Sequence, residues 1–412
     1  MTQQLPTKPL AAGPARTGRT ARAAVLAAFL WSLIAVPIGL WQLLDPGHGP
    51  FSHRLYEPSF TLPDGAPQWL GPTALIGAGL VGLLAARAKP RLWPLTALYA
   101  VVFGLLLSTT TPISFAGYLC AFLIPVAAVV GPILLVRNRT GRIVTAAAMA
   151  ALLVALGLLG IVDYAAVGAF AASLGGTIAG MGGFIAVQFW IVAGGAIWAG
   201  LTFRLLSLKY EGSPTPEWLT PARAAKWGRT ASWIAFACAL PYGLTRMTWL
   251  TPWAWLGGPL GEEIDLTIRV WGLCLGFAAL SGGILCLGMT QRWGTRWPFW
   301  MPVLKGRPVP PKVAIVPAAI VASLFTFVAV PFVALGIRGG HTELVWAFPF
   351  YVWGPALGAA TLAYAIRRGV LRPGASGPAE AATVTPRAPG PKAPAASAPP
   401  VKPVRASVPK AP

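Results

Sequence analysis

Residues 142–204 read RIVTAAAMAALLVALGLLGIVDYAAVGAFAASLGGTIAGMGGFIAVQFWIVAGGAIWAGLTFR, and Asp163 is the only charged residue between the two arginines at its ends. A helix needs about 20 apolar residues to cross the hydrocarbon core of a bilayer, so this stretch has room for more than one crossing. Basic residues beside membrane spans stay on the cytoplasmic side. Arg142 and Arg204 therefore require an even number of crossings between them, and we predict two, at 143–162 and 184–203.

The piece between these two spans, residues 164–183, is rich in Gly and Ala and nearly as apolar as its neighbours. A third crossing here would place Arg204 on the wrong side of the membrane. We therefore expect an outer-surface or re-entrant segment, which the bilayer tolerates only where protein or water satisfies its backbone polar groups.

The composition of the whole chain indicates that lipid is its main solvent. The 412 residues are 56% hydrophobic and 10% charged, whereas soluble domains carry about 25% charged residues. We predict an all-α fold, a polytopic transmembrane helix bundle of about ten spans. The predicted spans are 23–44, 69–86, 92–108, 119–136, 143–162, 184–203, 231–250, 270–289, 313–335 and 344–366.

The basic residues give this bundle an orientation. When the spans alternate from a cytoplasmic N-terminus, all but four of the 32 Lys and Arg residues fall on the cytoplasmic side. The four on the outer side are Arg54, Arg246, Arg269 and Arg338. Both termini are then cytoplasmic. The formal net charge of +21 predicts contact with anionic lipid headgroups at that face rather than with nucleic acid.

Three regions follow from this pattern. We expect residues 1–22 to be a basic cytoplasmic N-terminus and residues 23–366 to be the ten-span transmembrane bundle. Residues 367–412 are basic and rich in Pro and Ala. They have too little apolar area to fold, so we expect a disordered cytoplasmic tail.

The densest group of polar side chains lies at the outer ends of spans 231–250 and 270–289. Tyr242 and Arg246 are four residues apart and share a helix face, and an arginine within a span is costly unless it has a role or reaches the surface. We hypothesise a binding site for a charged or zwitterionic solute, to which the following segment adds Glu262, Glu263, Asp265 and Arg269. The alternative is anchoring at the membrane interface by an aromatic belt of Trp249, Trp253 and Trp255.

Gln188 is the most conspicuous uncharged polar residue within a predicted span. It either hydrogen-bonds between helices or lines a solute path. The sequence has no Ser/His/Asp order typical of hydrolases, no phosphate-binding glycine loop and no metal-ligand spacing, and its four cysteines all lie in predicted spans. We therefore expect no enzyme activity, no cofactor, no metal site and no disulfide.

The heavy use of Ala, Gly, Pro and Arg with few Lys is typical of a GC-rich genome. In composition and architecture the chain resembles uncharacterised multi-pass integral membrane proteins of high-GC actinobacteria. That resemblance implies a bacterial plasma membrane and implies no activity.

Two functional hypotheses stay open. Ten spans with frequent prolines favour a transporter- or permease-like protein for a small solute. The lack of a carboxylate within the predicted spans favours a non-transporting scaffold or sensory subunit that acts through protein partners.

Overall fold

Apolar helices make up most of the chain. The computed structural model describes residues 14–53, 56–61, 65–86, 89–136, 138–210, 213–251, 266–297, 305–340 and 342–371. No β-strand forms within these ranges, where one isolated bridge joins Arg296 and Pro308. The predicted all-α class is confirmed for the described residues. The chain has two units, Met1–Gly374 and Ala375–Pro412; all described residues belong to the first, and most of the predicted tail lies outside them.

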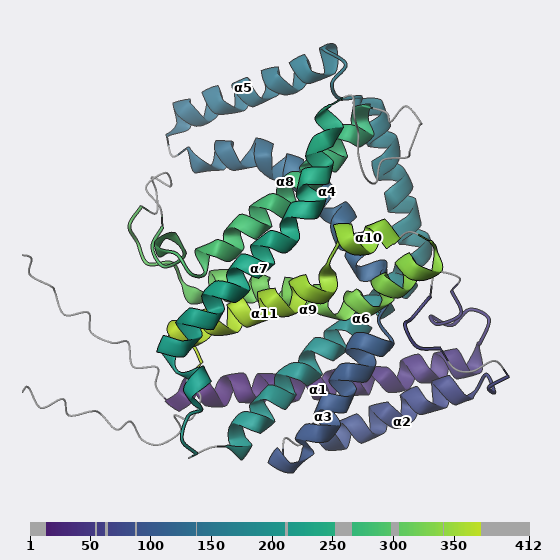
Figure 1. Cartoon of the computed structure of the whole chain (residues 1–412). Helices are drawn as coiled ribbons and strands as arrows, with labels where there is room; N and C mark the ends of the chain where they lie inside the picture. The colour runs from purple at the N-terminus through teal and green to yellow at the C-terminus, as the bar shows by residue number, and fades with distance from the viewer. Residues whose placement is uncertain are drawn as a thin grey trace, which may run out of the picture. The chain divides into compact units, whose positions relative to one another are not determined.

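Eleven α-helices occur in the described residues (Figure 1): α1 (Pro14–Leu44), α2 (Leu70–Ala85), α3 (Trp93–Val101), α4 (Thr111–Leu135), α5 (Arg139–Leu158), α6 (Tyr164–Lys209), α7 (Pro221–Met247), α8 (Leu266–Gly288), α9 (Pro311–Arg338), α10 (Thr342–Ala347) and α11 (Phe350–Arg367). Short 3-10 turns are η1 (Pro90–Leu92), η3 (Glu217–Leu219), η4 (Thr248–Leu250) and η5 (Arg292–Gly294), and η2 (Val102–Leu106) is a π-helix. Each predicted span overlaps one of these helices.

Six of the described helices are long and apolar enough to cross a membrane. They are Arg22–Leu44, Thr111–Leu135, Arg139–Leu158, Tyr164–Lys209, Arg269–Gly288 and Pro311–Arg338. Leu70–Ala85 and Pro90–Leu106 are apolar but shorter. By length and composition, the chain therefore has the helices of a membrane protein.

Helix α6 differs from the expectation of a separate outer segment at 164–183. It continues without a break through 46 residues, which corresponds to a length of about 69 Å, more than twice the hydrocarbon thickness of about 30 Å. Its start is fixed by Asp163, whose carboxylate accepts hydrogen bonds from the backbone N–H groups of Ala165 and Ala166 at 2.8 and 3.1 Å. The Gly- and Ala-rich piece is thus the first half of one long helix.

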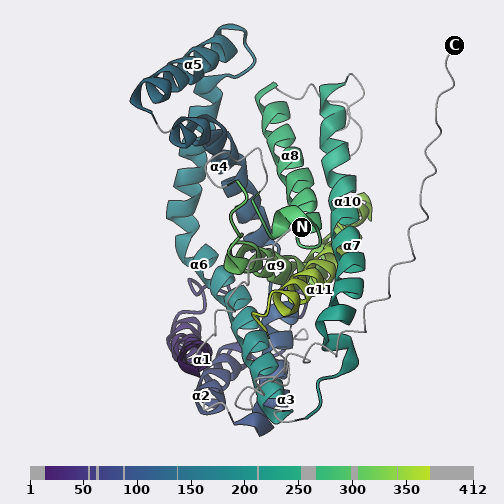
Figure 2. The same cartoon turned by 90° about the vertical axis from the view of Figure 1, so that its left-hand side faces the viewer.

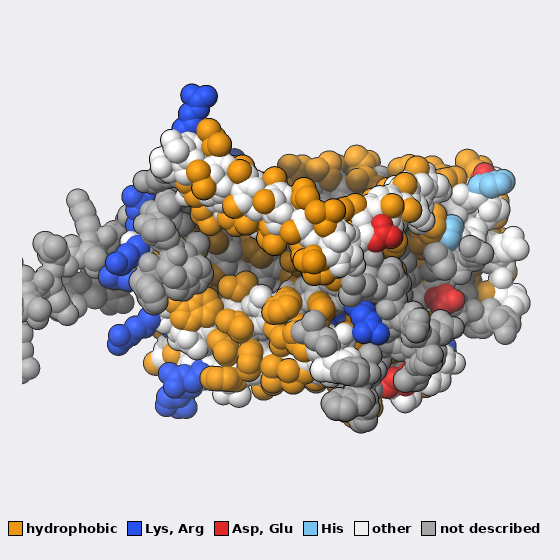
Figure 3. Space-filling model, turned by 90° about the horizontal axis from the view of Figure 1, so that it is seen from above, with side chains coloured by type: hydrophobic (Ala, Val, Ile, Leu, Met, Phe, Trp, Pro, Cys, Tyr) orange, Lys and Arg blue, Asp and Glu red, His pale blue; other side chains and the backbone are white. Residues whose placement is uncertain are grey.

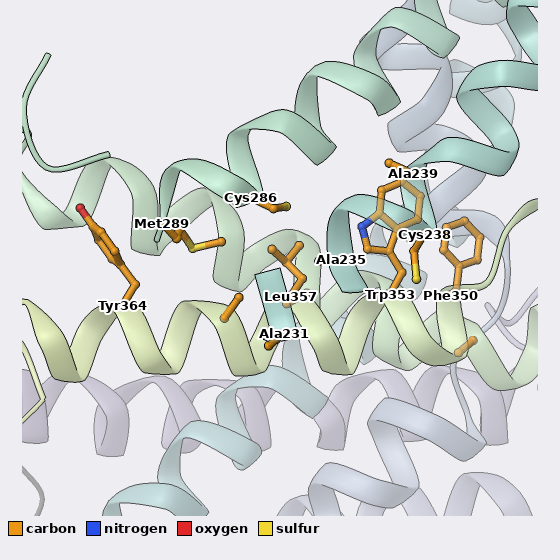
Figure 4. Close-up of a cluster of buried hydrophobic side chains, with 13 residues drawn as sticks. Ala231, Ala235, Cys238, Ala239, Cys286, Met289, Phe350, Trp353, Leu357 and Tyr364 are labelled. Carbon is orange, nitrogen blue, oxygen red and sulfur yellow. The ribbon is translucent and has the colours of Figure 1, made fainter. Parts of the chain in front are cut away.

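The buried side chains form two large clusters, each within its own group of four helices. One group consists of α1, α2, α3 and α6, and the other of α7, α8, α9 and α11. Figures 1 and 2 show α1, α2 and α3 below α8 and α9, whereas α6 extends from the level of α1–α3 upward toward α5. Figure 4 shows the second cluster, where the side chains of α11 point toward α7 and α8. The labelled residues of α11 are Phe350, Trp353, Leu357 and Tyr364.

The two groups touch along a close contact that we call the seam, made by Gly104, Ser108, Gly195 and Phe327. A Cβ atom on Gly104 in η2 would lie 2.6 Å from the Phe327 ring of α9, and one on Gly195 of α6 would lie 3.1 Å from the same ring. The Ser108 hydroxyl donates a hydrogen bond to the Phe327 carbonyl at 2.8 Å. Side chains larger than hydrogen would therefore separate the helix groups at this point.

Charged side chains gather at opposite ends of the described bundle. On the face shown in Figure 3, most Lys and Arg side chains lie at one end, Asp, Glu and His lie toward the other, and hydrophobic side chains cover the middle. At the basic end, Arg367 and Arg368 donate hydrogen bonds to the carbonyls of Met289 and Val309 at 3.0 and 2.8 Å. On this face, the described charges are therefore separated as the sequence predicted.

Candidate functional site

Arg246 lies in the last turn of α7, and aromatic rings surround its guanidinium group. The guanidinium carbon is 5.1 Å from the centroid of Tyr242 and 4.0 Å from that of Trp249. These distances are typical of cation–π contacts. Tyr242 is one helical turn before Arg246, as the sequence predicted, and Trp249 follows in η4.

Helix α8 makes room for this group through two glycines on one face. A Cβ atom on Gly276 would lie 2.6 Å from the Cβ atom of Arg246, and one on Gly272 would lie 2.3 Å from the Trp249 ring. The close helix contact expected of small residues four positions apart therefore supports the stem of Arg246 and the buried ring of Trp249.

Helix α10 closes the other side of the site. The rings of Tyr242 and Phe348 are 4.4 Å apart. Beside them lies a hollow of about 50 Å³, lined by Tyr242, Thr245, Arg246, Glu343, Leu344, Ala347 and Phe348. Its size fits a few water molecules or one small functional group, such as a carboxylate. The hollow has a charge of each sign on its wall.

The other residues of the predicted solute site have different outcomes. Glu262, Glu263 and Asp265 lie outside the described residues. Arg269 is half-buried near the start of α8, the helix whose Gly276 lies against Arg246. The structure therefore brings Tyr242 and Arg246 together. It adds Glu343, which the sequence did not indicate for this site.

Gln188 does not join this hollow. It is fully buried on α6, and its Oε1 atom accepts a hydrogen bond of 2.9 Å from the Thr109 hydroxyl. The Thr109 oxygen in turn accepts one from the backbone N–H of Thr111 at 3.3 Å. Gln188 precedes Gly195 by seven residues, so both lie on the same face of α6. The candidate residues thus form two sites, a hollow near one end of α7 and a polar pair next to the seam.

The sequence indicated that Trp249 lies near Arg246, because it is three residues later on a predicted helix. It gave no indication of Thr109, because this residue meets Gln188 across 79 positions of the chain. It also gave none of Phe348 or Glu343, since only the fold brings α10 to α7.

Comparisons with protein-family models, with curated proteins and with solved structures found no match. We therefore infer the function from the geometry of these two sites.

Proposed function

We propose that this chain is a ten-span protein of a bacterial plasma membrane with both termini in the cytoplasm. The support is that every predicted span overlaps helical residues, although 344–366 is divided between α10 and α11, and that on the face shown in Figure 3 most basic residues lie at one end of the bundle. The positive-inside rule then places the basic end in the cytoplasm, in contact with anionic lipid headgroups.

The orientation predicts which loops can be labelled from outside. In a variant that lacks the four native cysteines, Gly47→Cys, in the turn after α1, should react with a membrane-impermeant maleimide on intact cells. Ser213→Cys, between α6 and α7, should react only after the cells are permeabilised. Both positions are exposed, so burial does not explain a difference. The reverse pattern would contradict the orientation.

For activity, we propose a permease-like protein that moves a small solute. The observation that carries this proposal is the division of the buried core into two separately packed helix groups that meet at a narrow seam. Many secondary transporters work by rocking one helix group against the other, with the solute bound between them. The buried polar pair of Thr109 and Gln188 lies next to the seam, because Thr109 directly follows Ser108.

The hollow beside Arg246 is the entry site in this proposal. In the proposed topology it lies at the outer end of span 231–250, and its guanidinium group suits a carboxylate of the solute, while Glu343 suits a cationic group. The solute is therefore anionic or zwitterionic. Glu262, Glu263, Asp265 and Arg269 remain proposed members of this site because they lie close to it along the chain.

A panel of anionic and zwitterionic solutes tests the entry site through the thermal stability of the purified protein. We expect at least one solute to raise the melting temperature of the natural protein and Arg246→Ala to abolish that rise, because the guanidinium group supplies the main charge contact. Arg338→Ala is the matched control, since this exposed arginine ends α9. A rise that survives in Arg246→Ala would exclude the proposed role of Arg246.

A second candidate function, a scaffold or sensory subunit, is favoured by α4 and α5. The apolar windows of these helices have no buried residues among those described, and Leu158 of α5 is 84% exposed. In a bilayer such faces contact lipid or the transmembrane helix of a partner protein. If this candidate is correct, no solute in the panel raises the melting temperature.

A further inference from the structure

A buried hydrogen-bond donor next to the seam has no partner among the described residues. The chain of bonds from Thr111 through Thr109 occupies the Oε1 atom of Gln188. The Nε2 atom of the same amide is buried and makes no hydrogen bond within the part of the chain that the structure describes. Such a donor costs free energy within a bilayer, so its presence requires an explanation such as a bound group or a state in which water reaches it.

The backbone next to this amide has an irregular helix. In η2 the Leu107 N–H donates to the Val102 carbonyl at 2.9 Å, five residues apart, as in a π-helix. Single π-turns within longer helices are frequent at functional sites. This one carries Gly104, whose backbone contacts Gly195, and it leads directly into Ser108 and Thr109. The irregular turn thus forms one wall of the seam.

The contact across the seam is thin compared with the packing inside each helix group. Gly104 and Gly195 of the first group meet the Phe327 ring of the second, and the Ser108 hydroxyl donates a hydrogen bond to the Phe327 carbonyl. A contact of this kind interlocks few side chains, so the groups can separate there without disrupting either core. Separation would expose the free amide donor of Gln188 on the α6 face that carries Gly195.

We propose that the seam opens to water and that the Gln188 amide then donates a hydrogen bond to a carboxylate or carbonyl oxygen of the solute. This inference rests on the proposed permease-like function and adds the solute-contacting residue within the bundle. Thr109 orients the amide by holding its oxygen, which leaves the N–H groups for the solute.

Cysteine accessibility tests the opening without knowledge of the solute. In the variant that lacks native cysteines, Gln188→Cys and Thr109→Cys are treated with a water-soluble cationic thiosulfonate. The control is Ala235→Cys, which is equally buried but lies inside the α7–α11 cluster. We expect both seam positions to react at least about tenfold faster than the control, because the rate reports the population of the open state. Reaction at the control rate for both would overturn the proposal, and melting curves verify that each variant is folded.

The contact with the solute is tested in Thr109→Cys, which retains Gln188. Sodium acetate and acetamide serve as the probes for a carboxylate and a carbonyl group. We expect at least one of them to slow the labelling, and the added substitution Gln188→Leu to remove this protection. Labelling that neither probe slows would overturn the role of Gln188. The labelling rate reports the opening of the seam and needs no transported solute. A seam that stays closed is therefore distinguishable from a solute panel in which no compound raises the melting temperature.

Discussion

Replacing Gly195 by valine is expected to lower the free energy of unfolding by about 1–3 kcal/mol, the range typical of overpacking in a close contact. The added Cβ atom would lie 2.6 Å from the Cα atom and 2.9 Å from the N atom of Gly104. Both are backbone atoms of η2, so no side-chain rotation relieves the clash. Helix α6 must instead move away from η2 within the first helix group, and thermal unfolding of the purified protein should begin at a lower temperature.

Gly200→Val is the matched control for this substitution. Gly200 lies on the same helix, and a Cβ atom there meets nothing within 4 Å. Any general effect of valine on α6 is therefore common to both variants, and only the contact with η2 differs. Equal melting temperatures for the two variants would show that the close contact between α6 and η2 does not contribute to stability.

A larger loss, about 3–5 kcal/mol, is expected for Trp31→Ala, since removal of a buried tryptophan loses many contacts at once. The Trp31 ring of α1 stacks on Trp190 at 4.6 Å and meets the edge of Phe103 at 4.5 Å. Its indole N–H donates to the Trp190 carbonyl at 2.9 Å. One side chain thus joins α1, η2 and α6, and its loss should shift the melting curve strongly.

Trp346→Ala provides the comparison for Trp31→Ala. The Trp346 side chain on α10 is 73% exposed, so its removal takes away little packing and should change the melting temperature only slightly. Trp31→Phe should fall between the two, because phenylalanine keeps part of the stacking and loses the hydrogen bond. A melting temperature of Trp31→Ala close to that of Trp346→Ala would contradict the proposed central position of this ring.

The candidate site was only partly predictable from the sequence. The pairing of Tyr242 with Arg246 follows from helical periodicity, and the structure places the guanidinium group over the ring. The sequence also suggested that Gln188 belongs either to helix packing or to a solute path. It gave no means to choose between these, because the environment of Gln188 depends on Thr109, which is distant along the chain.

The sequence did not indicate that the outer-surface or re-entrant segment expected at 164–183 is continuous in one helix with the predicted span 184–203. The charge pattern predicts two crossings between Arg142 and Arg204, and we assigned one helix of standard length to each. Residues 164–183 were not part of either helix, so we expected them to form a separate segment. Helix α6 instead runs through both parts. Charge limits how often a chain crosses a membrane, but it does not limit how far a helix continues beyond one crossing.

The sequence by itself determined the helical class, the apolar helices and the separation of charge between the two ends of the bundle. These properties depend on interactions within one helix and between that helix and its solvent, and both are recorded in consecutive residues. Only the tertiary structure decided that the core divides into two groups, that Gly195 meets Gly104 and that Gln188 lies apart from Arg246. An apolar helix surface is about as stable in contact with lipid as in contact with another apolar helix. Which helices pair is therefore decided by close packing between residues that are distant along the chain.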